Sequence, residues 1–178
     1  MKKIFMTMAA AFMAVSMNAQ VFIGGGVGFE SVSHNGNSET YLKVLPEIGY
    51  VLNEDWALGI GLGYTQFDSA TPAVKATQVT VNPYARYTFA SFDHVNLFID
   101  GGFGFTNTDY DAYKNNTWSI GLKPGVAINL NDKVSFVAHA GFFGYASSKD
   151  DTTGAKATNV FGLDLDGSNL SFGFYYNF

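Results

Sequence analysis

Residues 56–65 read WALGIGLGYT, in which large apolar side chains alternate with alanine, glycine and threonine. Every second residue from Trp56 to Tyr64 is large and apolar, and the residues between them are small. Successive side chains of a strand point to opposite faces, so this period of two predicts a β-strand with one large apolar face and one small face. A helix would instead repeat its apolar residues every three or four positions.

The same alternation occurs in seven further stretches, at residues 21–30, 41–50, 78–89, 95–105, 118–128, 134–143 and 169–178. Each is about as long as the ~9–11 residues that a tilted strand needs to cross a bilayer, and longer than an ordinary globular strand of ~5–6 residues.

The predicted connections alternate between tight turns and longer polar loops. The turns lie near Asn53, Asp93 and Asn131, and the loops at residues 33–39, 68–76, 107–116 and 147–167. Short turns on one side and long loops on the other are typical of outer-membrane barrels, whose termini both lie on the short-turn, periplasmic side.

The ionisable residues within these stretches all lie on the small-residue face, so the large apolar face carries no charge. They are Glu30, Lys43, Glu47, Arg86, Asp100, Lys123 and His139. A soluble, lipocalin-like barrel would place the large apolar residues inside, where eight strands have no room for so many. Backbone groups in lipid must bond to one another, so a spanning sheet must close. The sequence therefore predicts an all-β fold, an eight-stranded antiparallel up-and-down transmembrane β-barrel.

The N-terminal residues have the organisation of a secretory signal peptide. Lys2 and Lys3 precede an apolar run at residues 4–15 that is too short to span a membrane, and a small-residue exit ends at Ala19. This order of charge, apolar core and small residues is typical of a segment removed on export; the alternative is a buried N-terminal helix. We therefore divide the chain into a signal peptide, residues 1–19, and an outer-membrane β-barrel, residues 20–178.

Composition restricts the partners of the exported chain. Removal of residues 1–19 takes away two lysines and no acid, so the formal charge moves from −5 to −7 and no basic patch remains for nucleic acid. Charged residues make up only 14% of the sequence, well below the ~25% of soluble domains. The chain contains no cysteine, so disulfides cannot stabilise it.

Aromatic residues lie at both ends of the predicted strands, where they would form the two interfacial girdles of a barrel. At the turn ends they are Tyr50, Trp56, Phe89, Tyr176 and Phe178, and at the loop ends Phe29, Tyr64, Phe105, Trp118 and Phe142.

No motif in the sequence carries catalytic chemistry. The glycine-rich runs at residues 24–28 and 59–63 fall inside strands, so they do not predict a phosphate-binding loop. His34, His94 and His139 lack metal-ligand spacing, and the paired loop aspartates are more typical of a solvated loop than of a calcium site. We expect no catalytic, cofactor-binding or metal-binding residues and no enzymatic activity.

The last stretch, NLSFGFYYNF, ends on an aromatic residue and resembles the C-terminal signal that the barrel-insertion machinery recognises. Phe174, Tyr176 and Phe178 would form this assembly signal. With the signal peptide and the eight stretches, the chain resembles the small outer-membrane β-barrel proteins of the outer-membrane protein A and X type, often called porin-family. Its tail, FGLDLDGSNLSFGFYYNF, is similar to that of members from Bacteroides-type bacteria.

The resemblance implies a location in the bacterial outer membrane. It also implies lipids and the insertion machinery as partners, with a monomer as the expected state. No peptidoglycan-binding domain of the outer-membrane protein A kind is expected after the last strand. Membership of such a fold implies an activity poorly, because these folds host many functions.

Residue numbers predict which interior charges face one another. In an antiparallel hairpin the numbers of two facing residues add up to a constant, which is twice the number at the centre of the turn. The predicted pairs are Arg86–Asp100, Asp100–Lys123, Lys123–His139 and Glu30–Lys43, and Glu47 is expected to reach toward Arg86. An eight-stranded interior is just wide enough for side chains, and a lone buried charge costs several kcal/mol, so the charges should pair and plug the barrel. A hydrated lumen with loosely solvated charges is the alternative.

Three functions stay open on this evidence. The favoured one is a structural or surface-interaction barrel whose interior is plugged by the charged network. The others are a narrow porin that passes small solutes and a lipid-active outer-membrane enzyme. The sequence identifies no extracellular ligand.

We expect export to cleave the chain after Ala19, because the small-residue exit ends there. N-terminal sequencing of protein from isolated outer membranes should begin at Gln20. Recovery of Met1 in that fraction would contradict the prediction.

Overall fold

The computed structural model describes residues 21–34, 37–70, 73–110, 113–152, 154–164 and 171–178. The predicted signal peptide lies outside these residues and stays a prediction. Within them the chain forms ten strands: β1 (Val21–His34), β2 (Asn37–Val51), β3 (Trp56–Ala70), β4 (Ala73–Ser91), β5 (Val95–Tyr110), β6 (Lys114–Asn129), β7 (Val134–His139), β8 (Phe142–Asp150), β9 (Thr158–Asp164) and β10 (Ser171–Asn177). No helix in the described part is long and apolar enough to cross a membrane.

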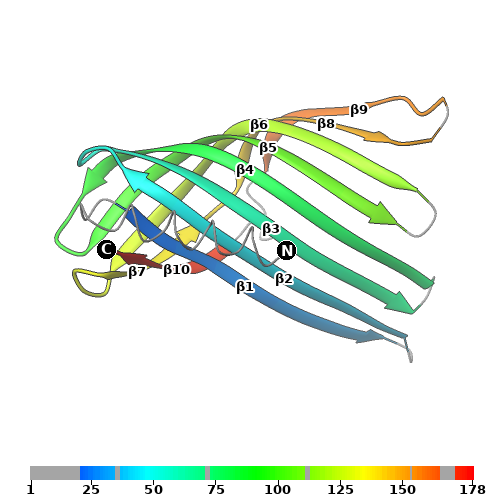
Figure 1. The fold of residues 1–178 in the computed structure, drawn as a ribbon, viewed down its shortest axis with the longest axis horizontal. Coiled ribbons are helices and arrows are strands. Elements are labelled where there is room, and N and C mark those ends of the chain that lie inside the picture. Colours follow the sequence, from blue (N-terminus) through cyan, green and yellow to red (C-terminus); the bar gives the residue numbers. More distant parts are fainter. Residues whose placement is uncertain (1–20, 35–36, 71–72, 111–112, 153, 165–170) are drawn as a thin grey trace, which may run out of the picture.

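Eight of the described strands close into a ring in the order β1-β2-β3-β4-β5-β6-β7-β10, with β10 paired to β1. Every neighbouring pair is antiparallel, so the predicted eight-stranded up-and-down barrel is confirmed (Figure 1). These segments form strands because every second residue is large and apolar, which gives each strand one apolar face. We call the end with the short turns and the C-terminus the turn end, and the opposite end the loop end.

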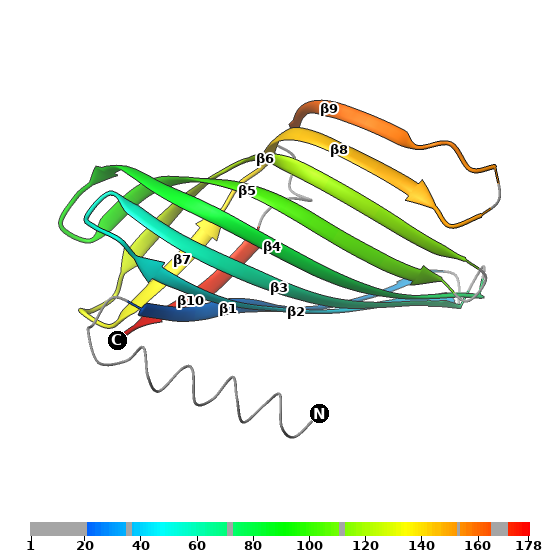
Figure 2. The same cartoon turned by 45° about the horizontal axis from the view of Figure 1, so that its top comes forward.

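The four predicted long loops are largely strand. The first three are hairpins whose strands extend well beyond the alternating stretches. Only residues 35–36, 71–72 and 111–113 lie between the paired strands of these hairpins. The fourth, residues 147–167, was predicted as a loop but contains the end of β8 and all of β9. These two strands form a hairpin that continues from β7 and stands apart from β1 in both views (Figures 1 and 2).

The seventh predicted strand is interrupted at Ala140–Gly141. Gly141 has a φ of 76°, a left-handed conformation that glycine adopts without steric cost. The side-chain alternation reverses across this break, so Phe142 lines an interior cavity and Phe143 is 43% exposed on the outside. The prediction that Phe142 lies in the outer aromatic girdle is therefore wrong.

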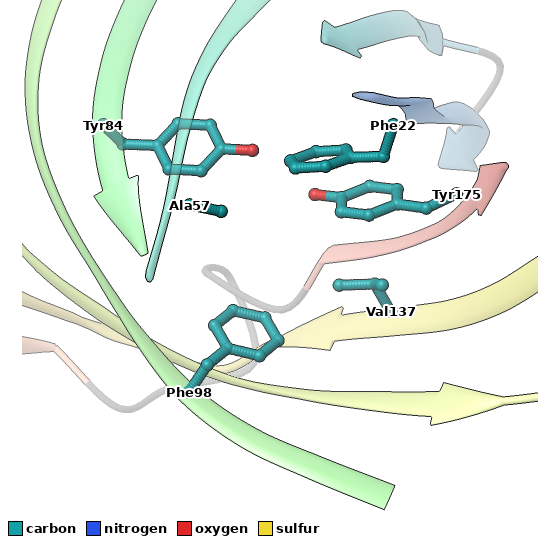
Figure 3. Packing of buried hydrophobic residues seen from close by; sticks show 6 residues of the cluster. All are labelled: Phe22, Ala57, Tyr84, Phe98, Val137 and Tyr175. Atoms are coloured by element: carbon teal, nitrogen blue, oxygen red, sulfur yellow. The ribbon is translucent and has the colours of Figure 1, made fainter. Parts of the chain in front are cut away.

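The outer surface of the ring is apolar and its interior holds the buried core, as the alternation requires. Exposed large side chains include Trp56, Leu58, Ile60, Trp118 and Phe174. The buried apolar cluster lies inside the barrel (Figure 3) and consists of Phe22, Ala57, Tyr84, Phe98, Val137 and Tyr175. The apolar outer surface is the reverse of the surface of a soluble protein and is the one expected in lipid.

Two of the tight turns are stabilised in the same way, by hydrogen bonds to the side chain of an asparagine. Asn53 Oδ1 accepts hydrogen bonds from the backbone N–H groups of Asp55 and Trp56, at 3.0 and 2.9 Å. Asn131 Oδ1 accepts equivalent bonds from Lys133 and Val134, both at 2.9 Å. Asparagine commonly bonds its own backbone two residues on and so stabilises turns. Both turns span five residues, which sets the register of the strands that they join.

The predicted assembly signal lies on the outer surface at the turn end. The side chains of Phe174, Tyr176 and Phe178 are all exposed there. The Tyr176 and Phe178 rings meet edge to face at 5.0 Å, and the Phe178 backbone N–H donates to the Val21 carbonyl at 3.0 Å. The last residue therefore adds a bond to the β1–β10 closure.

Deletion of Phe178 should lower the fraction of protein that folds to the heat-modifiable form on a gel, because it removes this bond and the terminal aromatic. Phe92→Ala is the matched control, since it removes an exposed aromatic at the same end without touching the closure. Equal folded fractions for the deletion and the wild type would count against the role of Phe178 in assembly.

Candidate functional site

The single arginine of the chain lies inside the barrel, where it is 8% exposed. Arg86 Nε donates to Asp100 Oδ1 at 2.7 Å, and Arg86 Nη2 donates to Asp100 Oδ2 at 2.8 Å. Asp100 is 5% exposed, so the two groups form a buried bidentate pair between β4 and β5. Bidentate arginine–carboxylate pairs are among the strongest hydrogen-bonded contacts in proteins.

Four aromatic rings enclose the Arg86 guanidinium. Its Cζ lies 3.8 Å from the Phe98 ring centroid, and 5.2 to 5.8 Å from those of Phe22, Tyr84 and Tyr175. Phe22 and Tyr175 also stack on each other, with centroids 5.0 Å apart (Figure 3). A cation over an aromatic face gains about 2 kcal/mol when it is desolvated, so the rings offset part of the cost of burying the charge.

Hydrogen bonds extend the pair to three further strands. His139 Nε2 on β7 lies 2.8 Å from Asp100 Oδ2. Arg86 Nη2 donates to the Tyr175 hydroxyl at 3.3 Å, and that hydroxyl donates in turn to Glu47 Oε2 on β2. The Tyr84 hydroxyl donates to the same Glu47 oxygen at 3.0 Å. We call this set the Arg86 layer; it consists of Phe22, Glu47, Tyr84, Arg86, Phe98, Asp100, His139 and Tyr175.

Each aromatic ring of the Arg86 layer lies over a glycine directly opposite it on the neighbouring strand. The pairs are Phe22–Gly49, Tyr84–Gly59, Phe98–Gly125 and Tyr175–Gly24. A Cβ on any of these glycines would lie 2.0 to 2.4 Å from an atom of the ring. Glycine is therefore required at these four positions because the rings occupy the space of its missing side chain.

The register around Arg86 and Asp100 is as predicted. Arg86 faces Asp100, and Asp100 faces Lys123. The first agreement has an unexpected cause: the turn at Asp93 is one residue longer than assumed, and a β-bulge between Thr88 and Ala90 restores the register. Facing Asp100 does not bring Lys123 into an ion pair, because both Asp100 oxygens are bonded to Arg86 and His139.

Two predicted facing pairs are wrong by two residues. His139 faces Gly125 rather than Lys123, because the five-residue turn is centred on Asp132 and not on Asn131. In the first hairpin Lys43 faces Gly28, and Glu30 faces Tyr41. That register is centred on the sequence Asn35-Gly36, a strong hairpin signal that the sums of residue numbers did not use. The side chain of Glu30 lies outside the described part of the structure.

The expected reach of Glu47 toward Arg86 is also wrong, since its carboxylate is bonded by Tyr84 and Tyr175 and contacts Arg86 only through the Tyr175 hydroxyl. Sequence reasoning placed both tyrosines on the inner face but gave them no role. The feature that could have identified them is the glycine opposite each ring, Gly59 for Tyr84 and Gly24 for Tyr175.

Two interior cavities lie on either side of the Arg86 layer and share no lining residue. The turn-end cavity measures about 470 Å³ and is lined by Phe22, Arg86 and Phe98 among others. The loop-end cavity, which we call the outer chamber, measures about 310 Å³ and is lined by Glu47, Tyr84, Asp100 and His139 on the side of the layer. Lys43 and Lys123 also line the outer chamber.

Polar cross-strand contacts line the outer chamber and continue from it toward the loop end. The Thr80 and Thr106 hydroxyls lie 2.9 Å apart, and Asn107 Nδ2 donates to Asn116 Oδ1 at 2.8 Å. At the loop end Lys114 Nζ lies 2.8 Å from Asp109 Oδ2, which raises the pKa of that exposed lysine. Within the described residues, no group of three or more histidine, aspartate, glutamate or cysteine side chains is placed to hold a metal ion.

Comparisons with known proteins agree with this architecture. The neisserial surface protein A (NspA) structure superposes with a TM-score of 0.54 at 15% sequence identity, covering 89% of this chain and 97% of that one. The outer membrane protein OprG from Pseudomonas aeruginosa gives 0.53 at 14% identity, covering 90% and 96%. No curated protein matches the chain in sequence.

Residues 4–178 match the family model of the outer membrane protein beta-barrel domain. The match covers almost the whole chain, and the closed ring with its apolar outer surface and polar interior is the structure that such a family requires in lipid. The chain therefore belongs to the outer membrane protein beta-barrel family and is a protein of the bacterial outer membrane.

Proposed function

We propose that this protein is a closed, non-conducting barrel with a structural or surface-interaction role, and that the Arg86 layer is its plug. The observation that carries the proposal is the burial of Arg86 and Asp100 at the centre of an eight-stranded ring. An interior of that size is filled by side chains. Six of the eight ring strands contribute to the layer, which leaves little cross-section for solutes.

The division of the interior supports the proposal. The two cavities share no lining residue, and the aromatic rings and the Arg86–Asp100 pair lie between them. The layer is also fully bonded: within the described residues no buried side-chain nitrogen or oxygen lacks a hydrogen-bond partner. A bonded, packed layer is costly to open, because removing one partner leaves the other buried and unpaired.

A narrow porin is the second candidate, and the cavities are the observation in its favour. They lie in the lumen on either side of the Arg86 layer, so a small solute could pass if that layer rearranged. Among the residues that the structure describes, no catalytic constellation supports a lipid-active enzyme, and our proposal contains no enzymatic role.

We also propose the closer relationship to the outer-membrane protein A and X type from Bacteroides-type bacteria, on the strength of the C-terminal sequence. On the same basis we propose a monomer that contacts outer-membrane lipids and uses the barrel-insertion machinery during assembly. Phe174, Tyr176 and Phe178, exposed on the outer surface, are the proposed recognition residues.

Purified, folded protein should carry no steady ohmic current in a planar bilayer, because the plug leaves no continuous water path. A known large-pore porin inserted under the same conditions shows that a channel would be detected. A reproducible ohmic current from the wild-type protein would favour the narrow porin instead.

Arg86→Ala should lower the free energy of unfolding in detergent by about 3–5 kcal/mol, because it leaves the Asp100 carboxylate buried without its main partner. Adding Asp100→Asn should recover part of this loss, and adding Glu47→Gln should change little more, since Glu47 is bonded by tyrosines. Lys133→Ala, at an exposed turn, is the control. Strictly additive effects across this set, measured by urea titration, would contradict a coupled layer.

A further inference from the structure

The outer chamber contains two lysines that form no ion pair with a carboxylate of the described residues. Lys43 and Lys123 both line it, and within the described residues neither Nζ has a carboxylate oxygen within 4.0 Å. Elsewhere in the described part, Lys75 pairs with Asp68 at 3.3 Å and Lys114 pairs with Asp109, whereas the exposed Lys133, Lys149 and Lys156 have no such pair. Lys43 and Lys123 differ from the other lysines without an ion pair in that they line an interior cavity, in a chain whose net charge is negative.

The two lysines project from opposite walls of the ring. Lys43 lies on β2 and Lys123 on β6, which are separated by three strands on one side and by β1, β10 and β7 on the other. Both side chains are exposed to solvent although they point inward. Both lysines line the same cavity of about 310 Å³, so their ammonium groups share one small space.

The charges around the outer chamber favour an anion. Asp100 is neutralised by Arg86, so Glu47 is the one other carboxylate among the described lining residues. Two ammonium groups against one carboxylate leave an excess of one positive charge. Glu47 Oε2 is bonded by two tyrosine hydroxyls, and Glu47 forms no ion pair with either lysine.

The remaining lining of the outer chamber can bind hydroxyl groups. Thr65, Gln78, Thr80 and Ser119 present donors and acceptors to it, and glycine lines it at positions 61, 63, 102, 104 and 121. Its volume of about 310 Å³ is at the small end of ligand pockets, which measure ~300–1,000 Å³.

We propose that the outer chamber is a binding site for a small hydroxylated phosphate compound, with the phosphate held between Lys43 and Lys123. Lysine is a common phosphate ligand as a point charge, and two opposed lysines suit a doubly charged group. Threonine, serine and glutamine side chains bind the hydroxyls. This inference rests on the proposed function, in which the Arg86 layer closes the chamber on its turn side. It deepens that function by giving the barrel a ligand on its loop side.

The test is isothermal titration of the folded protein in detergent at low ionic strength with glucose 6-phosphate, and with glucose as the neutral control. Glucose 6-phosphate should bind at one site and glucose should not. Lys43→Met and Lys123→Met should each weaken binding by about tenfold or more. Lys149→Met, which removes an exposed lysine of β8 outside the chamber, should change the affinity by less than about twofold.

A second variant separates filling of the chamber from loss of charge. A Cβ on Gly61 would make ordinary contact with Glu47 Cγ at 3.5 Å, so Gly61→Leu can be accommodated by the wall while its side chain occupies the chamber. It should abolish binding with both lysines intact. Heat-modifiability on a gel checks that each variant is folded.

Absence of glucose 6-phosphate binding, equal binding of glucose, or unchanged affinity in both lysine variants would overturn the proposed site. These outcomes are distinct from failure of the proposed function, which is read from conductance. A barrel that conducts and still binds glucose 6-phosphate through Lys43 and Lys123 refutes the plug and keeps the site. A closed barrel that does not bind it refutes the site alone.

Discussion

Backbone amide and carbonyl groups in a bilayer can bond only to each other, and the rest of this structure depends on that constraint. It requires the sheet to close, and closure with eight strands leaves an interior about the width of facing side chains. Every inward residue must then share a narrow space with those of the opposite wall. The glycines opposite Phe22, Tyr84, Phe98 and Tyr175 are a direct result, since the rings fit only where the facing residue has no side chain.

The same narrow interior explains how one arginine can be held in the middle of a membrane protein. Arg86 is surrounded by the acceptor Asp100, four aromatic faces and a tyrosine hydroxyl, and each comes from a wall only one side chain away. In a wider barrel these groups would lie too far apart and water would solvate the charge. The width of the ring therefore determines both where the interior is packed and where it is left hollow for Lys43 and Lys123.

Much of the fold was predictable because membrane burial imposes a strict period of two on the sequence. The faces of the ring strands follow from it, whereas the Arg86–Asp100 pair also depends on the β-bulge between Thr88 and Ala90 that compensates for a longer turn. The errors occur where a single residue shifts the register or the face. The five-residue turn locked by Asn131 moves His139 by two positions relative to Lys123, and the left-handed Gly141 turns Phe142 inward. Such local conformations depend on backbone geometry that a hydrophobic pattern does not contain. The hydrogen bonds from Tyr84 and Tyr175 to Glu47 depend on contacts across the barrel, which no single strand records.

The pairing of β1 with β10 has a consequence for how the chain folds. Most other neighbours in the ring, from β1 through β7, are joined by a short connection and can pair as local hairpins. The β1–β10 contact instead brings together the first and last described strands, through four facing pairs from Phe22–Asn177 to Gly25–Phe174. The entropy cost of chain closure rises with the separation of the joined segments, and non-local pairings slow folding. The seam between β1 and β10 should therefore form last, after the hairpins have assembled. Among the described residues it has the fewest facing pairs of any two neighbouring strands in the ring, and so the fewest contacts to prevent reopening.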